Sequence, residues 1–67
     1  ENMDYRKAIK ELREKLLVSQ NELAKMLGVS FATVNRWENG RYEPNYKAKR
    51  KLRDLFEKNG IVLEGKK

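Results

Sequence analysis

Residues 19–40, SQNELAKMLGVSFATVNRWENG, restrict the fold of this chain more than any other stretch. The hydroxyl of Ser19 can accept a hydrogen bond from a free backbone N–H at the start of a helix. Glu22 follows three residues later, which completes a capping box. Gly28 can adopt the left-handed conformation that ends a helix, because it has no Cβ. The stretch therefore begins with a short helix over about residues 20–27, followed by a sharp turn.

A second helix follows at once, over about residues 31–39, with Ser30 as its N-cap and a stop at Asn39-Gly40. Val34 and Trp37 are three residues apart and face one way, towards a core. The opposite face carries Ala32, Asn35, Arg36 and Asn39. The small side chain of Ala24 allows the two helices to cross closely, so the unit is predicted to be a helix-turn-helix rather than two unrelated helices of a bundle.

The segments SQNELAKMLGVS and VNRWENGR closely resemble the Cro/phage-repressor (XRE) family of helix-turn-helix domains. The resemblance extends from about Ile9 to about Leu55. It implies an all-α, lambda-repressor-like bundle of four helices, or of five if the usual fifth helix is present. It also implies double-stranded DNA as the partner, with the helix over residues 31–39 in the major groove.

The flanking segments supply two more helices and most of the remaining core. The first is predicted over residues 5–16, with Asp4 as a cap, and the last over residues 46–59, between Asn45 and Gly60. Apolar residues repeat at helical spacing in both. The domain then covers residues 4–60, and 61–67 form a short tail. The predicted core consists of Leu12, Leu23, Leu27, Val34, Trp37, Leu52 and Phe56.

Composition excludes several function classes. The 67 residues suffice for one small domain, and the absence of cysteine and histidine removes disulfides, the commonest metal ligands and the commonest general base. No enzyme, metal or cofactor is therefore expected. The net charge is +6, with 7 basic and 6 acidic residues up to Gly40 but 9 and 4 after it. This basic bias suggests a polyanion, and a cytoplasmic location is expected because no signal peptide or membrane span is evident.

The chemistry of the second helix suits base recognition. Arginine can donate two hydrogen bonds to guanine, asparagine can pair with adenine, and apolar groups can touch thymine methyls. The predicted base contacts are Phe31, Ala32, Asn35 and Arg36. Phe31 could instead be a partial core residue. The family commonly has polar residues at the positions of Phe31 and Ala32, and this departure leaves the preferred base sequence open.

Positions around this helix are predicted to contact phosphates. The resemblance, together with the free N–H groups at helix starts, points to Gln20, Ser30, Thr33, Asn39 and Arg41. The alternative is a solvated glutamine and an ordinary C-cap turn with a solvated arginine. Most of the basic residues between Lys47 and Arg53 are interpreted as a solvated face. The resemblance also implies an ion pair between Arg13 and Glu38, against an ordinary surface arginine.

Three functions remain open from the sequence. The first is a transcriptional regulator that binds a palindromic site as a homodimer, with Val62 and Leu63 as apolar residues available for the dimer contact. The second is a DNA-targeting or antitoxin-like module of a larger protein or complex, which would bind as a monomer. The third is a protein-interaction bundle without DNA affinity.

Overall fold

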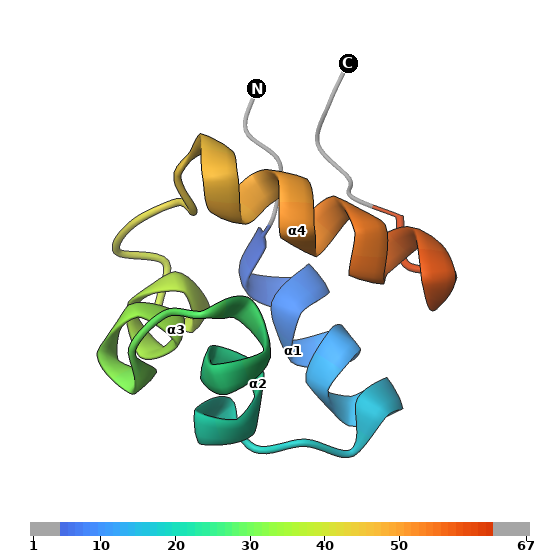
Figure 1. The fold of residues 1–67 in the computed structure, drawn as a ribbon, viewed down its shortest axis with the longest axis horizontal. Helices are drawn as coiled ribbons and strands as arrows, with labels where there is room; N and C mark the ends of the chain where they lie inside the picture. Colours follow the sequence, from blue (N-terminus) through green and yellow to red (C-terminus); the bar gives the residue numbers. More distant parts are fainter. Residues whose placement is uncertain (1–4, 63–67) are drawn as a thin grey trace.

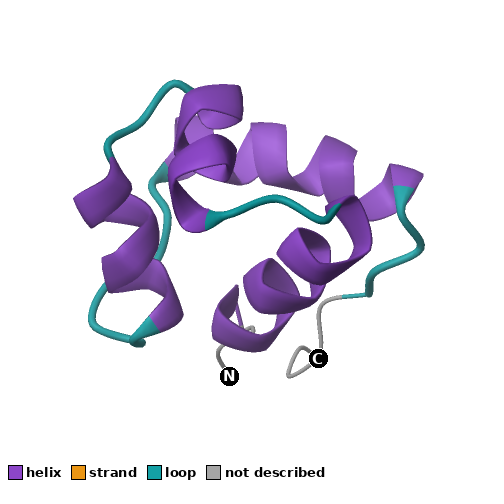
Figure 2. Cartoon of the chain, turned by 90° about the horizontal axis from the view of Figure 1, so that it is seen from below, coloured by secondary structure: helices purple, strands orange, loops and turns teal. Residues whose placement is uncertain are grey.

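The computed structural model describes residues 5–62, which contain four helices and no strand (Figures 1 and 2). Figure 1 shows α4 along one side of the molecule, α2 and α3 on the other, and α1 between them. The helices are α1 (Tyr5–Leu16), α2 (Gln20–Leu27), α3 (Phe31–Glu38) and α4 (Tyr46–Lys58). The predicted all-α class is confirmed. α3 and α4 each end one residue earlier than predicted, because Asn39 and Asn59 are their C-caps.

The core forms where all four helices meet. Every one of the seven predicted core residues is buried. They are joined there by Tyr5, Ala8, Ile9, Ala24, Ala48 and Ile61. Leu16 and Leu55, at the margins of their apolar stripes, are only partly buried. Ala24, a residue of α2, is buried, and α2 packs against α3 as expected for a helix-turn-helix.

The predicted N-caps are present in the described residues. Ser19 Oγ accepts from the backbone N–H of Glu22 at 3.0 Å, and the Glu22 carboxylate accepts from the Ser19 N–H at 2.8 Å, which is the expected capping box. Ser30 Oγ caps α3 and Asn45 Oδ1 caps α4 in the same manner. The predicted cap at Asp4 lies outside the described residues. Local side-chain chemistry thus fixes the starts of α2, α3 and α4.

The four helices end in the same way, but one of them does so without glycine. Glycines with positive φ follow α2, α3 and α4, whereas Leu17 follows α1 with φ 57°. The Val18 N–H donates to the Arg13 carbonyl at 3.1 Å and closes this turn. The Leu17 side chain is 88% exposed. Leucine in this conformation is strained, since its Cβ approaches the following carbonyl oxygen.

Replacing Leu17 with glycine is expected to stabilise the domain by about 0.5–1 kcal/mol, because relief of the strain outweighs the larger entropy of unfolded glycine. The midpoint of thermal unfolding should rise by about 2–8 °C. Leu17→Ala is the matched control, since it removes the same exposed side chain but keeps a Cβ. Equal melting of the alanine and glycine variants would contradict the assigned strain.

Candidate nucleic-acid interface

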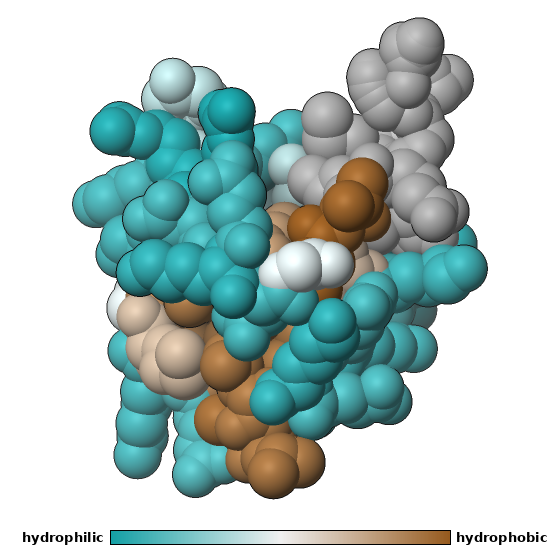
Figure 3. Space-filling model, turned by 90° about the vertical axis from the view of Figure 1, so that its right-hand side faces the viewer, coloured by the Kyte–Doolittle hydropathy of each residue, from teal (hydrophilic) through white to brown (hydrophobic). Residues whose placement is uncertain are grey.

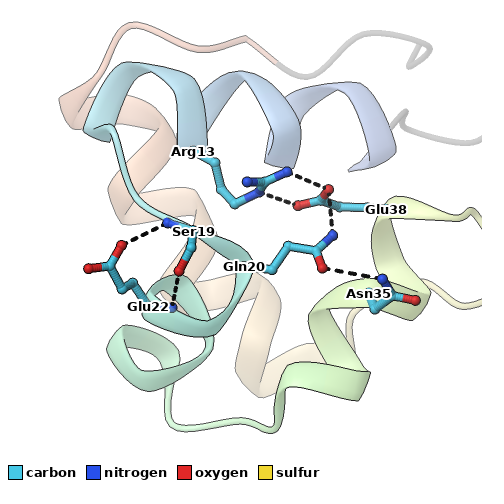
Figure 4. Close-up of polar contacts among 6 residues, drawn as sticks. All are labelled: Arg13, Ser19, Gln20, Glu22, Asn35 and Glu38. Atoms are coloured by element: carbon cyan, nitrogen blue, oxygen red, sulfur yellow. Dashed lines mark hydrogen bonds and ion pairs between the residues drawn. The ribbon is translucent and has the colours of Figure 1, made fainter.

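A buried carboxylate joins the first helix to the end of the third (Figure 4). Arg13 Nε donates to Glu38 Oε2 at 2.7 Å, and Arg13 Nη2 donates to Glu38 Oε1 at 2.9 Å. The Glu38 side chain is 3% exposed and that of Arg13 is 26% exposed. Arg13 is therefore paired rather than an ordinary surface arginine, as the family resemblance implied. The bidentate geometry fixes the orientation of α3 relative to α1.

The environment of Glu38 keeps its carboxylate charged. Burial raises the pKa of this carboxyl, but hydrogen bonds from Arg13 and Gln20 and the positive charges of Arg13 and Lys10 together bring the pKa below its ordinary value. The same pair raises the pKa of Arg13, chiefly through the hydrogen bond to Glu38. Both groups are thus ionised at neutral pH.

A chain of side-chain amides extends from this ion pair to the exposed face of α3 (Figure 4). Gln20 Nε2 donates to Glu38 Oε1 at 2.9 Å, and Asn35 Nδ2 donates to Gln20 Oε1 at 3.2 Å. Asn39 Nδ2 then donates to Asn35 Oδ1 at 2.9 Å. Because each amide has two N–H groups and two acceptor lone pairs, Asn35 keeps one donor and one acceptor. Adenine recognition requires one of each.

This amide chain was not predicted from the sequence. Gln20 was expected only to contact a phosphate, yet its side chain lies between α2 and α3 and bonds to residues 15 and 18 positions away. One Gln20 N–H is not used by these bonds and is available to a phosphate. The sequence carries no signal for the hydrogen bonds of Gln20 to α3, because they depend on how closely α2 and α3 cross.

The predicted base contacts lie together on the outer side of α3. Ala32 and Arg36 are exposed, Phe31 is half exposed, and Asn35 is partly buried beside Gln20. The guanidinium of Arg36 lies 5.6 Å from the centroid of the Tyr42 ring. The opposite side of the helix carries the buried Val34 and Trp37, so the face expected to meet DNA is free of core residues.

The predicted phosphate contacts border this face. Ser30 Oγ and Thr33 Oγ1 lie 2.9 Å apart at the start of α3 and share a hydrogen bond. Asn39 caps the other end of the helix, and the exposed Arg41 follows it. Gln20 begins the neighbouring helix α2. All five therefore belong to the helix-turn-helix or to the residue that follows it.

A helix-turn-helix family model matches residues 9–59, about three quarters of the chain. This chain belongs to that helix-turn-helix family. A relative from Archaeoglobus fulgidus, described as an uncharacterized HTH-type transcriptional regulator, is 41% identical over 51 residues, which cover 76% of this chain and 72% of the relative. No solved structure matches the chain. The resemblance inferred from the two sequence segments is thereby confirmed.

The family is a DNA-binding one rather than a family of enzymes. Within residues 5–62, no group of acidic side chains is placed to hold a metal ion. In the same part of the chain, no helix is long and apolar enough to cross a membrane.

Several basic side chains of α4 have partners within this helix-turn-helix domain. Lys51 Nζ donates to the Leu27 carbonyl at 3.2 Å and so caps the C-terminus of α2. Lys49 Nζ lies 3.3 Å from a Glu43 carboxylate oxygen, and Arg53 pairs with Glu57 on the same helix. These contacts give three of the basic residues partners within the fold, and the interpretation of this segment as mostly a solvated face stays a prediction.

Proposed function

We propose that this protein binds double-stranded DNA sequence-specifically as a transcriptional regulator, with α3 in the major groove. The observation that carries the proposal is the outer face of α3, where Arg36 is exposed and the neighbouring Asn35 keeps one amide donor and one acceptor beyond its hydrogen bonds within the domain. Among the described residues, Arg36 has no hydrogen bond or ion pair that would compete with a base. A family of DNA-binding domains provides the context for this face.

Each side chain has a role that follows from its chemistry. Arg36 donates to guanine O6 and N7, and Asn35 pairs with the N6 and N7 groups of adenine. Phe31 and Ala32 contact thymine methyl groups. The surrounding group holds the two DNA backbones through hydroxyl, amide and guanidinium donors. Its members are Gln20, Ser30, Thr33, Asn39 and Arg41. The place of action is the cytoplasm, where such a regulator meets DNA.

Replacing Arg36 with alanine is expected to weaken binding to the preferred site by about 1–3 kcal/mol and to relax the preference at one base pair. The preferred site is first obtained by selection from a random duplex pool, and affinities are then measured on it and on scrambled DNA. Arg41→Ala is the matched control. Its loss should be similar on both sequences, with the slope of log K against log salt reduced by about 1.

The proposal therefore requires that the Arg36 variant lose affinity mainly for the preferred site and that the Arg41 variant lose affinity for all sequences alike. If Arg36→Ala weakened binding to scrambled DNA as much as to the preferred site, Arg36 would be a phosphate contact. If neither variant changed DNA affinity, the interaction-bundle alternative would replace the proposed function.

We propose further that two copies bind a palindromic site. Figure 3 shows apolar surface at the end of the molecule where α1 and α4 finish. Leu17 and Val62, which follow those helices, are 88% and 80% exposed. Leu63, the other residue assigned to this contact, lies outside the described residues. Contiguous apolar surface beyond the core is typical of a contact between proteins, and doubling the few base contacts of one small domain increases specificity.

Val62→Asp is expected to weaken dimerisation at least tenfold, because a dimer contact would bury the new charge. Sedimentation equilibrium with and without a palindromic duplex measures it. Met26→Asp is the control, since Met26 is a half-exposed apolar residue on α2. Binding of one copy per duplex whatever the sequence would favour the DNA-targeting or antitoxin-like module.

A further inference from the structure

We propose that Tyr42, in the loop between α3 and α4, positions Arg36 for base recognition; the inference rests on the proposed function. The Arg36 guanidinium carbon lies 5.6 Å from the centroid of the Tyr42 ring, within the range of a cation–π interaction. The Tyr42 side chain is 62% exposed, so the ring is not held in place as part of the core. Tyr42 was not among the predicted site residues.

The backbone places Tyr42 beside Arg36. After α3, Gly40 adopts φ 78° and its N–H donates to the Trp37 carbonyl at 3.1 Å. The next N–H, that of Arg41, donates to the carbonyl of Arg36 itself, also at 3.1 Å. This closing bond turns the chain back along the last turn of α3 just before Tyr42. The tyrosine is thus brought to the helix position that carries Arg36.

The other end of the loop is also fixed. Pro44 is buried and restricts the backbone of the residue before it. Asn45 caps α4 through its hydrogen bond with the Ala48 N–H at 2.9 Å, and Glu43 pairs with Lys49 at 3.3 Å. Because residues on both sides of it are anchored, the backbone of Tyr42 is restricted in its movement relative to α3.

The geometry suits a positioning role. A guanidinium is planar, and its N–H donors all lie in the plane. An aromatic ring that stacks on one face leaves the donor edge free for guanine O6 and N7. A carboxylate partner would instead occupy the donors. Stacking also restricts the rotamers of a long side chain before DNA arrives, which reduces the entropy lost on binding.

The test compares the preference for guanine over adenine at the base pair read by Arg36, which the Arg36→Ala variant identifies. Tyr42→Leu, which keeps bulk but removes the aromatic face, is expected to lower this preference about two- to fivefold. Tyr42→Phe should retain it. In the Arg36→Ala background, Tyr42→Leu should have no further effect on the preference.

Tyr46 provides a matched control within the chain, because the Arg50 guanidinium lies 6.0 Å from its ring centroid. Tyr46→Leu should leave the guanine preference unchanged. Helical circular dichroism is recorded for every variant, so that loss of fold is separated from loss of preference.

The outcomes distinguish this inference from the proposed function. If the wild-type protein shows no sequence-specific DNA binding, the proposed function fails and the inference fails with it. If Arg36→Ala removes the guanine preference but Tyr42→Leu retains it, the positioning role alone is overturned. If Tyr42→Phe and Tyr42→Leu weaken binding to all sequences equally, the tyrosine hydroxyl contacts a phosphate and the ring does not position Arg36.

Discussion

Replacing Arg13 with alanine is expected to lower the free energy of unfolding by about 2–4 kcal/mol, as it leaves the Glu38 carboxylate buried without its cation. The range is slightly below that of a fully buried pair, since the Arg13 side chain is 26% exposed. A domain of this length has a total stability of only about 3–10 kcal/mol. Urea denaturation followed by circular dichroism measures the change.

The control is the exposed pair between Arg53 and Glu57, whose nearest atoms lie 3.6 Å apart with side chains 79% and 67% exposed. Arg53→Ala should change stability by less than about 0.5 kcal/mol, because water screens this pair. Equal effects of the two substitutions would show that the Arg13–Glu38 pair has no special importance.

The deficit of Arg13→Ala should also depend on pH. In the wild-type fold the pKa of Glu38 is below its ordinary value, so the stability contributed by the carboxylate is complete above the unfolded pKa and is lost as the pH falls through the folded pKa. Without Arg13, burial is expected to raise the pKa of Glu38. The difference between the two proteins should narrow as the pH falls through the raised pKa of the variant.

Gly28→Val is expected to lower the free energy of unfolding by about 2–3 kcal/mol, because a β-branched residue fits poorly at φ 73°. Space is not the reason: a Cβ on Gly28 would meet only the Lys51 Nζ, at an ordinary 3.7 Å. The midpoint of a thermal melt should fall by about 10–20 °C.

Asparagine adopts this backbone conformation more readily than valine, so Gly28→Asn should lose much less stability. If the valine and asparagine variants both had thermal midpoints close to that of the wild type, the left-handed conformation assigned to Gly28 would be contradicted.

Local chemistry explains why the helices were predictable. Ser19, Ser30 and Asn45 form their caps with residues three positions away, and Gly28 turns the chain by itself. The predicted ends at Asn39 and Asn59 are each one residue too late, because these residues continue some helical hydrogen bonds as C-caps. Signals within a few residues therefore predicted where the helices begin and turn, whereas the type of bundle was implied by the family resemblance.

The site was predictable only in part. Helical spacing identified the exposed side chains of α3, but the pairing of Arg13 with Glu38, 25 residues apart, was predicted only through the family resemblance. The amide chain through Gln20 depends on the distance and rotation between two helices, which periodicity does not specify. Tyr42 was missed for a related reason: a tyrosine in a loop carries no sequence signal for the arginine on which its ring lies.

The hydrogen bonds of Gln20 matter for anyone who wishes to retarget this protein to a new operator. The side-chain amide of Asn35 is hydrogen-bonded to that of Gln20, and Gln20 is in turn hydrogen-bonded to the buried Glu38. In the proposed role of position 35 as a base contact, a mutant library that randomises this position alone keeps Gln20, whose hydrogen bond was made to asparagine. Some variants would then bind DNA poorly because of the mismatch with Gln20 and not because of the base contact. The useful unit of variation is the pair of positions 20 and 35, changed together.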